Sequence, residues 1–172
     1  DIVALGAFSA IVQAVYMSHD KSMVLAATRG CEIFEILSKD GTNVHGAGKG
    51  PIVQGHCIDQ LWGLDVNPQK SSEFVTVGDD YTVRIWNRVE KKQVRMVKLD
   101  CMSRSACYSP DGNYIAVGCG GDIEGKEKDG PVGGFKILQD EDLAVAAEGR
   151  DSRQWISVIK YSADGKVLAV GS

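Results

Sequence analysis

Apolar and polar residues alternate in short runs along the chain, and turn residues separate these runs. Residues 82–86 (Thr-Val-Arg-Ile-Trp) and residues 93–99 alternate in this way, which is typical of β-strands. No stretch of helical length shows the period of a helix without a glycine or a turn cluster inside it. The pattern therefore predicts an all-β chain.

One segment recurs at long intervals. Residues 109–118 (SPDGNYIAVG) align without gaps to residues 162–171 (SADGKVLAVG), and looser copies begin at Ser18 and Asn67. The four starting positions are separated by 49, 42 and 53 residues. A period of about 40 to 50 residues is typical of β-propeller blades. Asp-Gly suits the turn between two strands because glycine readily adopts positive φ, so each copy predicts part of a four-stranded antiparallel blade.

The repeat predicts about three and a half blades of a larger propeller. We expect residues 1–54 to hold blade 1 with a preceding linker, residues 55–98 blade 2, residues 99–152 blade 3 with a polar insertion near 120–131, and residues 153–172 the first two strands of blade 4. Closed propellers have about four to eight blades. The remaining blades are therefore expected from the rest of a longer polypeptide.

The segment from residue 55 to residue 87 carries the clearest motif. It begins with Gly-His and ends with Ile-Trp-Asn, and it resembles one WD40 repeat with Asn87 in place of the usual final aspartate. The resemblance implies a hydrogen-bonded set of side chains inside the blade, formed by His56, Thr76, Asp80 and Trp86. Buried imidazole, hydroxyl, carboxylate and indole groups all need partners, and such a set satisfies them mutually.

A finer likeness extends over most of the chain. Gly-His at residue 55 is followed by Leu-Trp-Gly-Leu at residues 61–64 and by Asn-Pro at residue 67, and residues 99–118 read as the next blade. These motifs resemble the propeller repeats of the echinoderm microtubule-associated protein-like family. The resemblance implies a non-enzymatic interaction scaffold on microtubules or in an axoneme, with tubulin or another cytoskeletal protein as partner. A generic WD40 adaptor in a ligase or trafficking complex is the alternative.

Charge adds one feature to this picture. The net charge is −4, from 19 Lys and Arg against 23 Asp and Glu, so no overall field attracts the chain to nucleic acid or to a membrane. Residues 84–98 depart from this balance, with six cations against Glu90 alone. These cations are Arg84, Arg88, Lys91, Lys92, Arg95 and Lys98. They predict a contact patch for an acidic partner such as the tubulin tails, unless they only discourage edge pairing of an outer strand.

Catalytic, cofactor and metal-binding patterns are weak. The histidines are His19, His45 and His56, and none stands in a recognisable nucleophilic motif. Residues 120–126 match the start of a phosphate-binding loop, but Glu127 occupies the position that needs Ser or Thr. We expect a loop insertion there, with a nucleotide binder or propeller enzyme as a remote alternative. No enzyme activity, cofactor or metal is therefore expected.

Cysteine usage and hydropathy bear on the compartment. The five cysteines are irregularly spaced and contain no Cys-x-x-Cys pair, which favours a reducing, cytosolic environment. The longest apolar stretch, residues 2–17, is interrupted by Gly6, Ser9 and Gln13 and has no basic leader. It is expected to be neither a membrane span nor a signal peptide. The combined expectation is a cytoplasmic protein on the cytoskeleton, including the cilium or axoneme.

Overall fold

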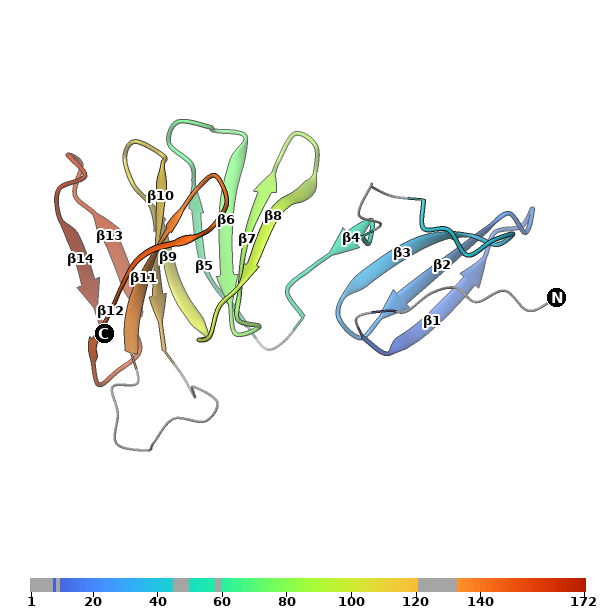
Figure 1. The fold of residues 1–172 in the computed structure, drawn as a ribbon, viewed down its shortest axis with the longest axis horizontal. Coiled ribbons are helices and arrows are strands. Elements are labelled where there is room, and N and C mark those ends of the chain that lie inside the picture. Colours follow the sequence, from blue (N-terminus) through green and yellow to red (C-terminus); the bar gives the residue numbers. More distant parts are fainter. Residues whose placement is uncertain (1–7, 9, 45–49, 58–59, 121–132) are drawn as a thin grey trace. The chain divides into compact units, whose positions relative to one another are not determined.

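The computed structural model describes residues 8, 10–44, 50–57, 60–120 and 133–172. These residues form β-strands, turns and loops, without any helix (Figure 1). None of the described segments is thus an apolar helix of membrane-spanning length. The strands make antiparallel sheets in which sequence neighbours pair, three with four strands and one with two. The predicted all-β propeller segment of about three and a half blades is confirmed.

Each sheet follows the chain without a crossover. The first contains β1 (Val12–Met17), β2 (Met23–Thr28), β3 (Glu32–Leu37) and β4 (Val53–Gln54). The second contains β5 (Leu61–Val66), β6 (Glu73–Gly78), β7 (Thr82–Asn87) and β8 (Lys92–Lys98). The third contains β9 (Ser103–Tyr108), β10 (Tyr114–Cys119), β11 (Gly133–Gln139) and β12 (Val145–Ser152). The last pair is β13 (Val158–Tyr161) and β14 (Leu168–Gly171).

The chain divides into two compact units, Asp1–Cys57 and Ile58–Ser172. The first unit holds blade 1, with a buried cluster of Val24, Ala26 and Ile36. The second unit holds blades 2 and 3 and the β13–β14 hairpin, with clusters of its own. Each unit therefore has a separate hydrophobic core.

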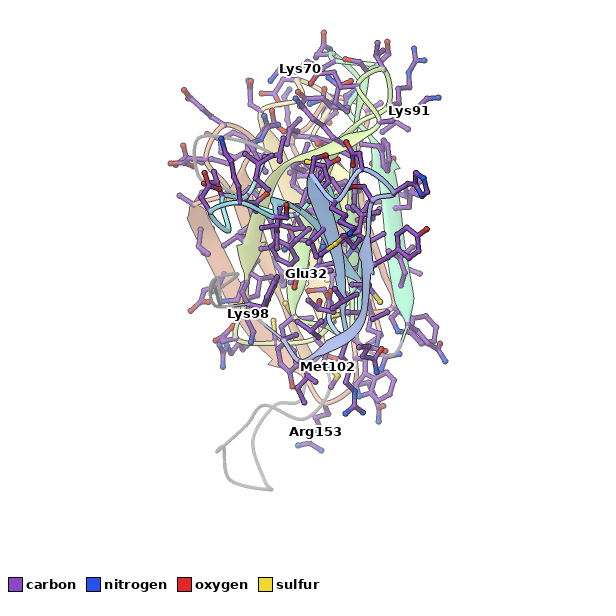
Figure 2. The ribbon with its side chains drawn as sticks, turned by 90° about the vertical axis from the view of Figure 1, so that its right-hand side faces the viewer. Glu32, Lys70, Lys91, Lys98, Met102 and Arg153 are labelled. Carbon is purple, nitrogen blue, oxygen red and sulfur yellow. The ribbon has the colours of Figure 1, made fainter. Side chains whose placement is uncertain are left out.

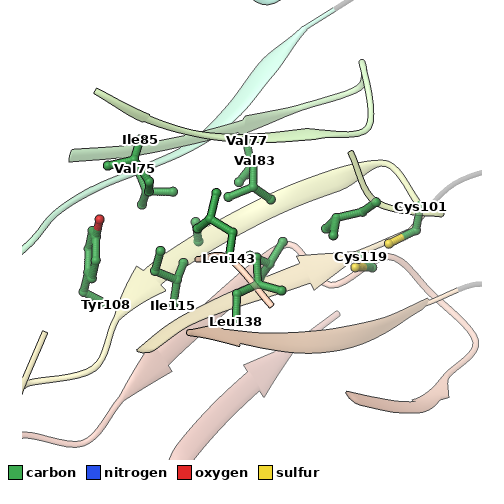
Figure 3. Close-up of a cluster of buried hydrophobic side chains, with 13 residues drawn as sticks. Val75, Val77, Val83, Ile85, Cys101, Tyr108, Ile115, Cys119, Leu138 and Leu143 are labelled. Carbon is green, nitrogen blue, oxygen red and sulfur yellow. The ribbon is translucent and has the colours of Figure 1, made fainter. Parts of the chain in front are cut away.

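In the second unit, successive blades pack face to face. Val77 and Val83 of blade 2 meet Ile115 and Val117 of blade 3 in one buried cluster (Figure 3). The neighbouring residue Ala116 instead joins a second cluster, which packs against β13. Successive side chains of a strand point to opposite faces, so β10 buries one face against each neighbouring blade. The core forms because both faces of the middle sheet are apolar.

The turn between the first two strands has the same hydrogen bonds in three blades. A serine hydroxyl donates to the carboxylate two residues later and accepts the backbone N–H five residues later. The pairs are Ser18 with Asp20, Ser109 with Asp111, and Ser162 with Asp164. These serine hydrogen bonds lower the pKa of each aspartate, to about 2 for Asp20. The sequence repeat thus corresponds to a repeated turn.

A close approach of two blades occurs at Gly63 on β5. A methyl group at this position would lie 2.5 Å from Cγ2 of Val77 and 2.9 Å from the backbone nitrogen of Ala106. Because one of these contacts is backbone, Gly63→Ala is expected to destabilise the protein by about 1–3 kcal/mol in urea unfolding. Gly171→Ala is the matched control, since its new methyl would have its nearest neighbour at 3.7 Å. Equal stability of the two variants would contradict this packing.

Candidate functional site

Two members of the predicted structural set are joined directly. The indole Nε1 of Trp86 on β7 donates to Oγ1 of Thr76 on β6, at 2.7 Å. The Trp86 ring also stacks on Phe74, with ring centroids 6.3 Å apart and an interplanar angle of 14°. His56 lies in the first unit, so its place in the set remains a prediction.

Asp80 lies in the turn between β6 and β7 and holds a buried cation. Its Oδ2 accepts from Nη2 of Arg84 at 3.1 Å, and the two side chains are only 2% and 4% exposed. Its Oδ1 accepts from the backbone N–H and the hydroxyl of Thr82. Arg84 also donates to the Thr82 hydroxyl and to Gln93. The turn is therefore stabilised by a buried ion pair within blade 2.

The structure corrects the predicted contact patch at two positions. Arg84 is buried in the pair with Asp80 and presents no cation to a partner. Arg95 is half-buried and bridges two carboxylates, those of Glu73 at 2.6 Å and Asp140 at 3.3 Å. The two arginines lie on opposite faces of the sheet, since Arg95 is paired with Ile85 and Arg84 with Met96, and residues of β7 are buried on both faces. A count of charges along the sequence does not distinguish the two faces.

The remaining cations of the run are exposed but separated. Arg88, Lys91 and Lys92 lie at the turn between β7 and β8, whereas Lys98 ends β8. Figure 2 shows Lys70 and Lys91 at one end of the second unit and Lys98 toward the other. The exposed cations at the first end form what we call the basic turn cluster: Lys70, Arg88, Lys91 and Lys92. Glu90 is the one carboxylate in the same turn, and it pairs with Lys92 at 2.6 Å.

The network that neutralises Arg95 joins blades 2 and 3. The buried carboxylate of Asp140 accepts from Lys70 at 2.9 Å and from Arg95 and the Tyr108 hydroxyl at 3.3 Å each. Burial raises the pKa of Tyr108, and the negative charge of Asp140 raises it further. Asp140 directly follows β11, and its side chain links blades 2 and 3. Alternation within one strand does not reveal such a contact.

A second cluster lies at the opposite end of this unit. The guanidinium carbon of Arg104 on β9 lies 4.3 Å from the ring centroid of Trp62 on β5 and 4.0 Å from that of Trp155, just before β13. We call these three residues the tryptophan–arginine stack. Asp79 lies beside it, 3.3 Å from Nη2 of Arg104. Sequence reasoning identified Trp62 only as part of a motif and missed the other members, because each lies in a different blade or turn.

Chemistry other than binding has little support in the described residues. No group of three His, Cys, Asp or Glu side chains among them is placed to hold a metal ion. The described cysteines are free, and Cys107 is buried as a small apolar residue. Most of the phosphate-loop motif, from residue 121 to Lys126, and the polar insertion near 120–131 lie in or overlap residues 121–132, outside the described part. His45 and the glycine-rich residues 46–49 are likewise outside it.

Comparison with known protein families gives a match that covers most of the second unit. Residues 61–172 match the family described as "Echinoderm microtubule-associated protein second beta-propeller". The match begins at the first residue of β5 and covers more than half of the chain. It therefore includes blades 2 and 3 and the β13–β14 hairpin.

Individual relatives agree with this match. Echinoderm microtubule-associated protein-like 2 of Mus musculus is 34% identical over 121 residues, which are 70% of this chain and 17% of the relative. Echinoderm microtubule-associated protein-like 1 of Homo sapiens is 29% identical over 150 residues, 87% of this chain and 16% of the relative. The chain thus spans less than a fifth of the length of these relatives. With its blades, its motifs and these matches in agreement, the chain belongs to the echinoderm microtubule-associated protein-like family, and its residues 61–172 correspond to that family's second β-propeller.

Proposed function

We propose that this chain is part of a non-enzymatic propeller protein that binds microtubules, and that the basic turn cluster contacts acidic segments of tubulin. The relatives are named as microtubule-associated proteins, which supports microtubules as the partner. The protein would act as a scaffold on the cytoplasmic cytoskeleton, including that of the cilium or axoneme. A fold alone does not determine function, so the proposal depends on the charged surface of blade 2.

The observation that carries this proposal is the exposure of the basic turn cluster. Arg88, Lys91 and Lys92 share one turn, and the Nε of Arg88 donates to the carbonyl oxygen of Ser71 in the neighbouring turn at 3.0 Å. This bond ties the two turns together, so Lys70 and the other three cations form one surface. Lys70 is paired with Asp140, and the turn itself holds Arg88, Lys91 and Lys92 against Glu90, a local charge of +2 in a chain whose net charge is −4. Such a patch attracts a negatively charged partner with a strength that falls as salt rises.

Blade 3 has the opposite charge at the same end. Its turns carry Asp111, Asp140, Glu141 and Asp142. Lys70 and Asp140 join the two regions through an ion pair. A flexible acidic tail would therefore contact blade 2 and be repelled from blade 3, which restricts how it can bind.

The proposal is tested by charge reversal in the full-length protein. Arg88→Glu/Lys91→Glu/Lys92→Glu is expected to weaken co-pelleting with microtubules roughly tenfold or more at low salt, because three exposed attractions become repulsions. The wild-type interaction should also weaken with added salt and after the acidic tubulin tails are removed.

Reversal of three other exposed cations of the second unit provides the matched control. Arg153→Glu/Lys160→Glu/Lys166→Glu changes the net charge by the same amount outside the turns of blade 2 and is expected to pellet nearly as well as wild type. If both triple variants lost binding equally, only the total charge would matter and the assigned surface would be wrong. Absence of pelleting by the wild-type protein would contradict the microtubule proposal and favour an adaptor role.

A further inference from the structure

The tryptophan–arginine stack has an unusual arrangement for a surface cation. Trp62, Arg104 and Trp155 come from the beginnings of three successive blades, whose first strands β5, β9 and β13 lie side by side. The guanidinium lies within 4.3 Å of both ring centroids. Cation–π attraction on both faces holds the arginine in one position. The planar fork of Arg104 is thus preorganised.

The hydrogen-bond donors of this fork are not used. Arg104 makes no hydrogen bond with any residue that the structure describes, and its Nε is completely buried without a partner. Its one ion pair among the described residues joins Nη2 to Oδ1 of Asp79 at 3.3 Å, and this buried oxygen has no hydrogen bond either. The other oxygen, Asp79 Oδ2, accepts from Trp62 Nε1 at 2.9 Å and from the backbone nitrogen of Gln60 at 3.2 Å. The donors of the Arg104 terminal nitrogens are therefore held by an ion pair alone and can still donate to an external acceptor.

The two indole rings are both supported and accessible. Trp62 is 47% exposed and Trp155 is 44% exposed. Trp62 is anchored by its bond to Asp79. Trp155 packs so closely on Gly120 that a methyl group there would lie 2.7 Å from its Cα and Cβ. The rings therefore offer apolar surface on either side of the arginine. Because they are already held in place, binding costs little additional side-chain entropy.

Charges at this end of the second unit favour an anionic ligand. Figure 2 shows Lys98 and Arg153 at the same end as Met102, which directly precedes β9. Lys98 and Arg153 form no ion pair within the described part of the chain, whereas Asp100 is paired with Arg150 at 2.7 Å. Lys98 and Arg153 therefore add positive charge at this end of the second unit.

We propose that the tryptophan–arginine stack binds an extended acidic peptide segment of a partner protein. An Asp or Glu carboxylate of the peptide accepts from the terminal nitrogens of Arg104, and apolar side chains of the peptide cover Trp62 and Trp155. A carboxylate fits better than a phosphate, because Asp79 lies 3.3 Å from the guanidinium and would repel a doubly charged group more strongly.

The spacing of the peptide side chains follows from strand geometry. In an extended peptide, residues two apart point to the same side and are about 7 Å from each other. Apolar residues two positions before and after the acidic one would therefore reach the outer faces of the two rings. The ligand pattern is apolar–x–acidic–x–apolar. This site lies at the opposite end of the unit from the basic turn cluster and does not depend on the function proposed for that cluster.

Panning a display library of short random peptides against the full-length protein tests the site. Enriched peptides are expected to carry the apolar–x–acidic–x–apolar pattern. The affinity of one such peptide, measured by fluorescence anisotropy, should fall at least about tenfold on Arg104→Gln, because a charge-assisted bidentate contact is lost. Arg104→Lys should also weaken it, since lysine lacks the planar fork. Arg88→Gln, which removes an exposed arginine at the opposite end of the unit, is the matched control and should retain the affinity.

A change in the peptide tests the contact without any risk that a protein variant is misfolded. Replacing the acidic residue of the peptide by its amide leaves the protein untouched and is expected to reduce affinity by a similar factor of about ten. Failure to enrich acidic peptides would overturn the proposal. Equal binding by the acid and amide peptides, or by wild type and Arg104→Gln, would overturn it as well. Preference for a phosphorylated peptide over its glutamate counterpart would show that the ligand class is wrong.

Discussion

Asp80→Ala is expected to destabilise the protein by about 3–5 kcal/mol, the cost of leaving a buried charge without its partner. The carboxylate and the Arg84 guanidinium are 2% and 4% exposed. Removing Asp80 also deprives the Thr82 hydroxyl and backbone N–H of their acceptor. Urea unfolding of the full-length protein, followed by circular dichroism, measures the loss.

A double variant tests whether the loss of stability comes from the unpaired charge of Arg84 or from the loss of packed side-chain volume. Asp80→Ala/Arg84→Met removes both charges and keeps a long apolar side chain, so it is expected to recover much of the stability that Asp80→Ala loses. Asp164→Ala is the control for an exposed turn aspartate, and its effect should be smaller. A stable Asp80→Ala variant, or a double variant no better than the single one, would contradict the buried pair.

Trp86→Ala is expected to cost about 3–5 kcal/mol, as large aromatic truncations in packed blades do. The indole stacks on Phe74 and donates to Thr76, so both a packed ring and a polar contact disappear. Thermal or urea unfolding followed by circular dichroism is the measurement. A melting curve like that of wild type would show that Trp86 does not support the blade.

Two milder variants separate the contribution of ring packing at Trp86 from that of its hydrogen bond to Thr76. Trp86→Phe keeps an aromatic ring against Phe74 and loses the N–H, so it is expected to cost only about 1–3 kcal/mol. Thr76→Val keeps the shape of the side chain and removes the acceptor, leaving the indole N–H unpaired at a similar cost of about 1–3 kcal/mol. If either variant matched the loss of Trp86→Ala, the hydrogen bond rather than ring packing would dominate.

Local sequence signals predicted the architecture well. Alternation along residues 82–86 and the recurring Ser-x-Asp turns are properties of single strands and hairpins, and the sheets follow them. These signals are short-range, because side-chain direction in a strand repeats every two residues and a turn is defined by a few residues. The family likeness rested on the same local motifs and agrees with the match over residues 61–172.

The candidate sites were predicted less completely. The basic run was visible as charge, but Arg84 and Arg95 face inward while Arg88 and Lys91 remain exposed. The direction of a side chain depends on strand register, which shifts between β7 and β8 because Ile85 is paired with Arg95 and Trp86 with Gln93. Net charge along the sequence contains no information on this register.

The repeating blades, their turns and the family can be inferred from the amino-acid sequence alone. Which polar side chains act together becomes visible only when the blades are packed against one another. Arg104 meets Trp62 and Trp155, and Asp140 meets Arg95, because the first strands and the turns of successive blades lie side by side. Each of these residues is unremarkable in its own strand or turn. Their chemistry arises from contacts between blades, which depend on how sheets pack and not on any local pattern.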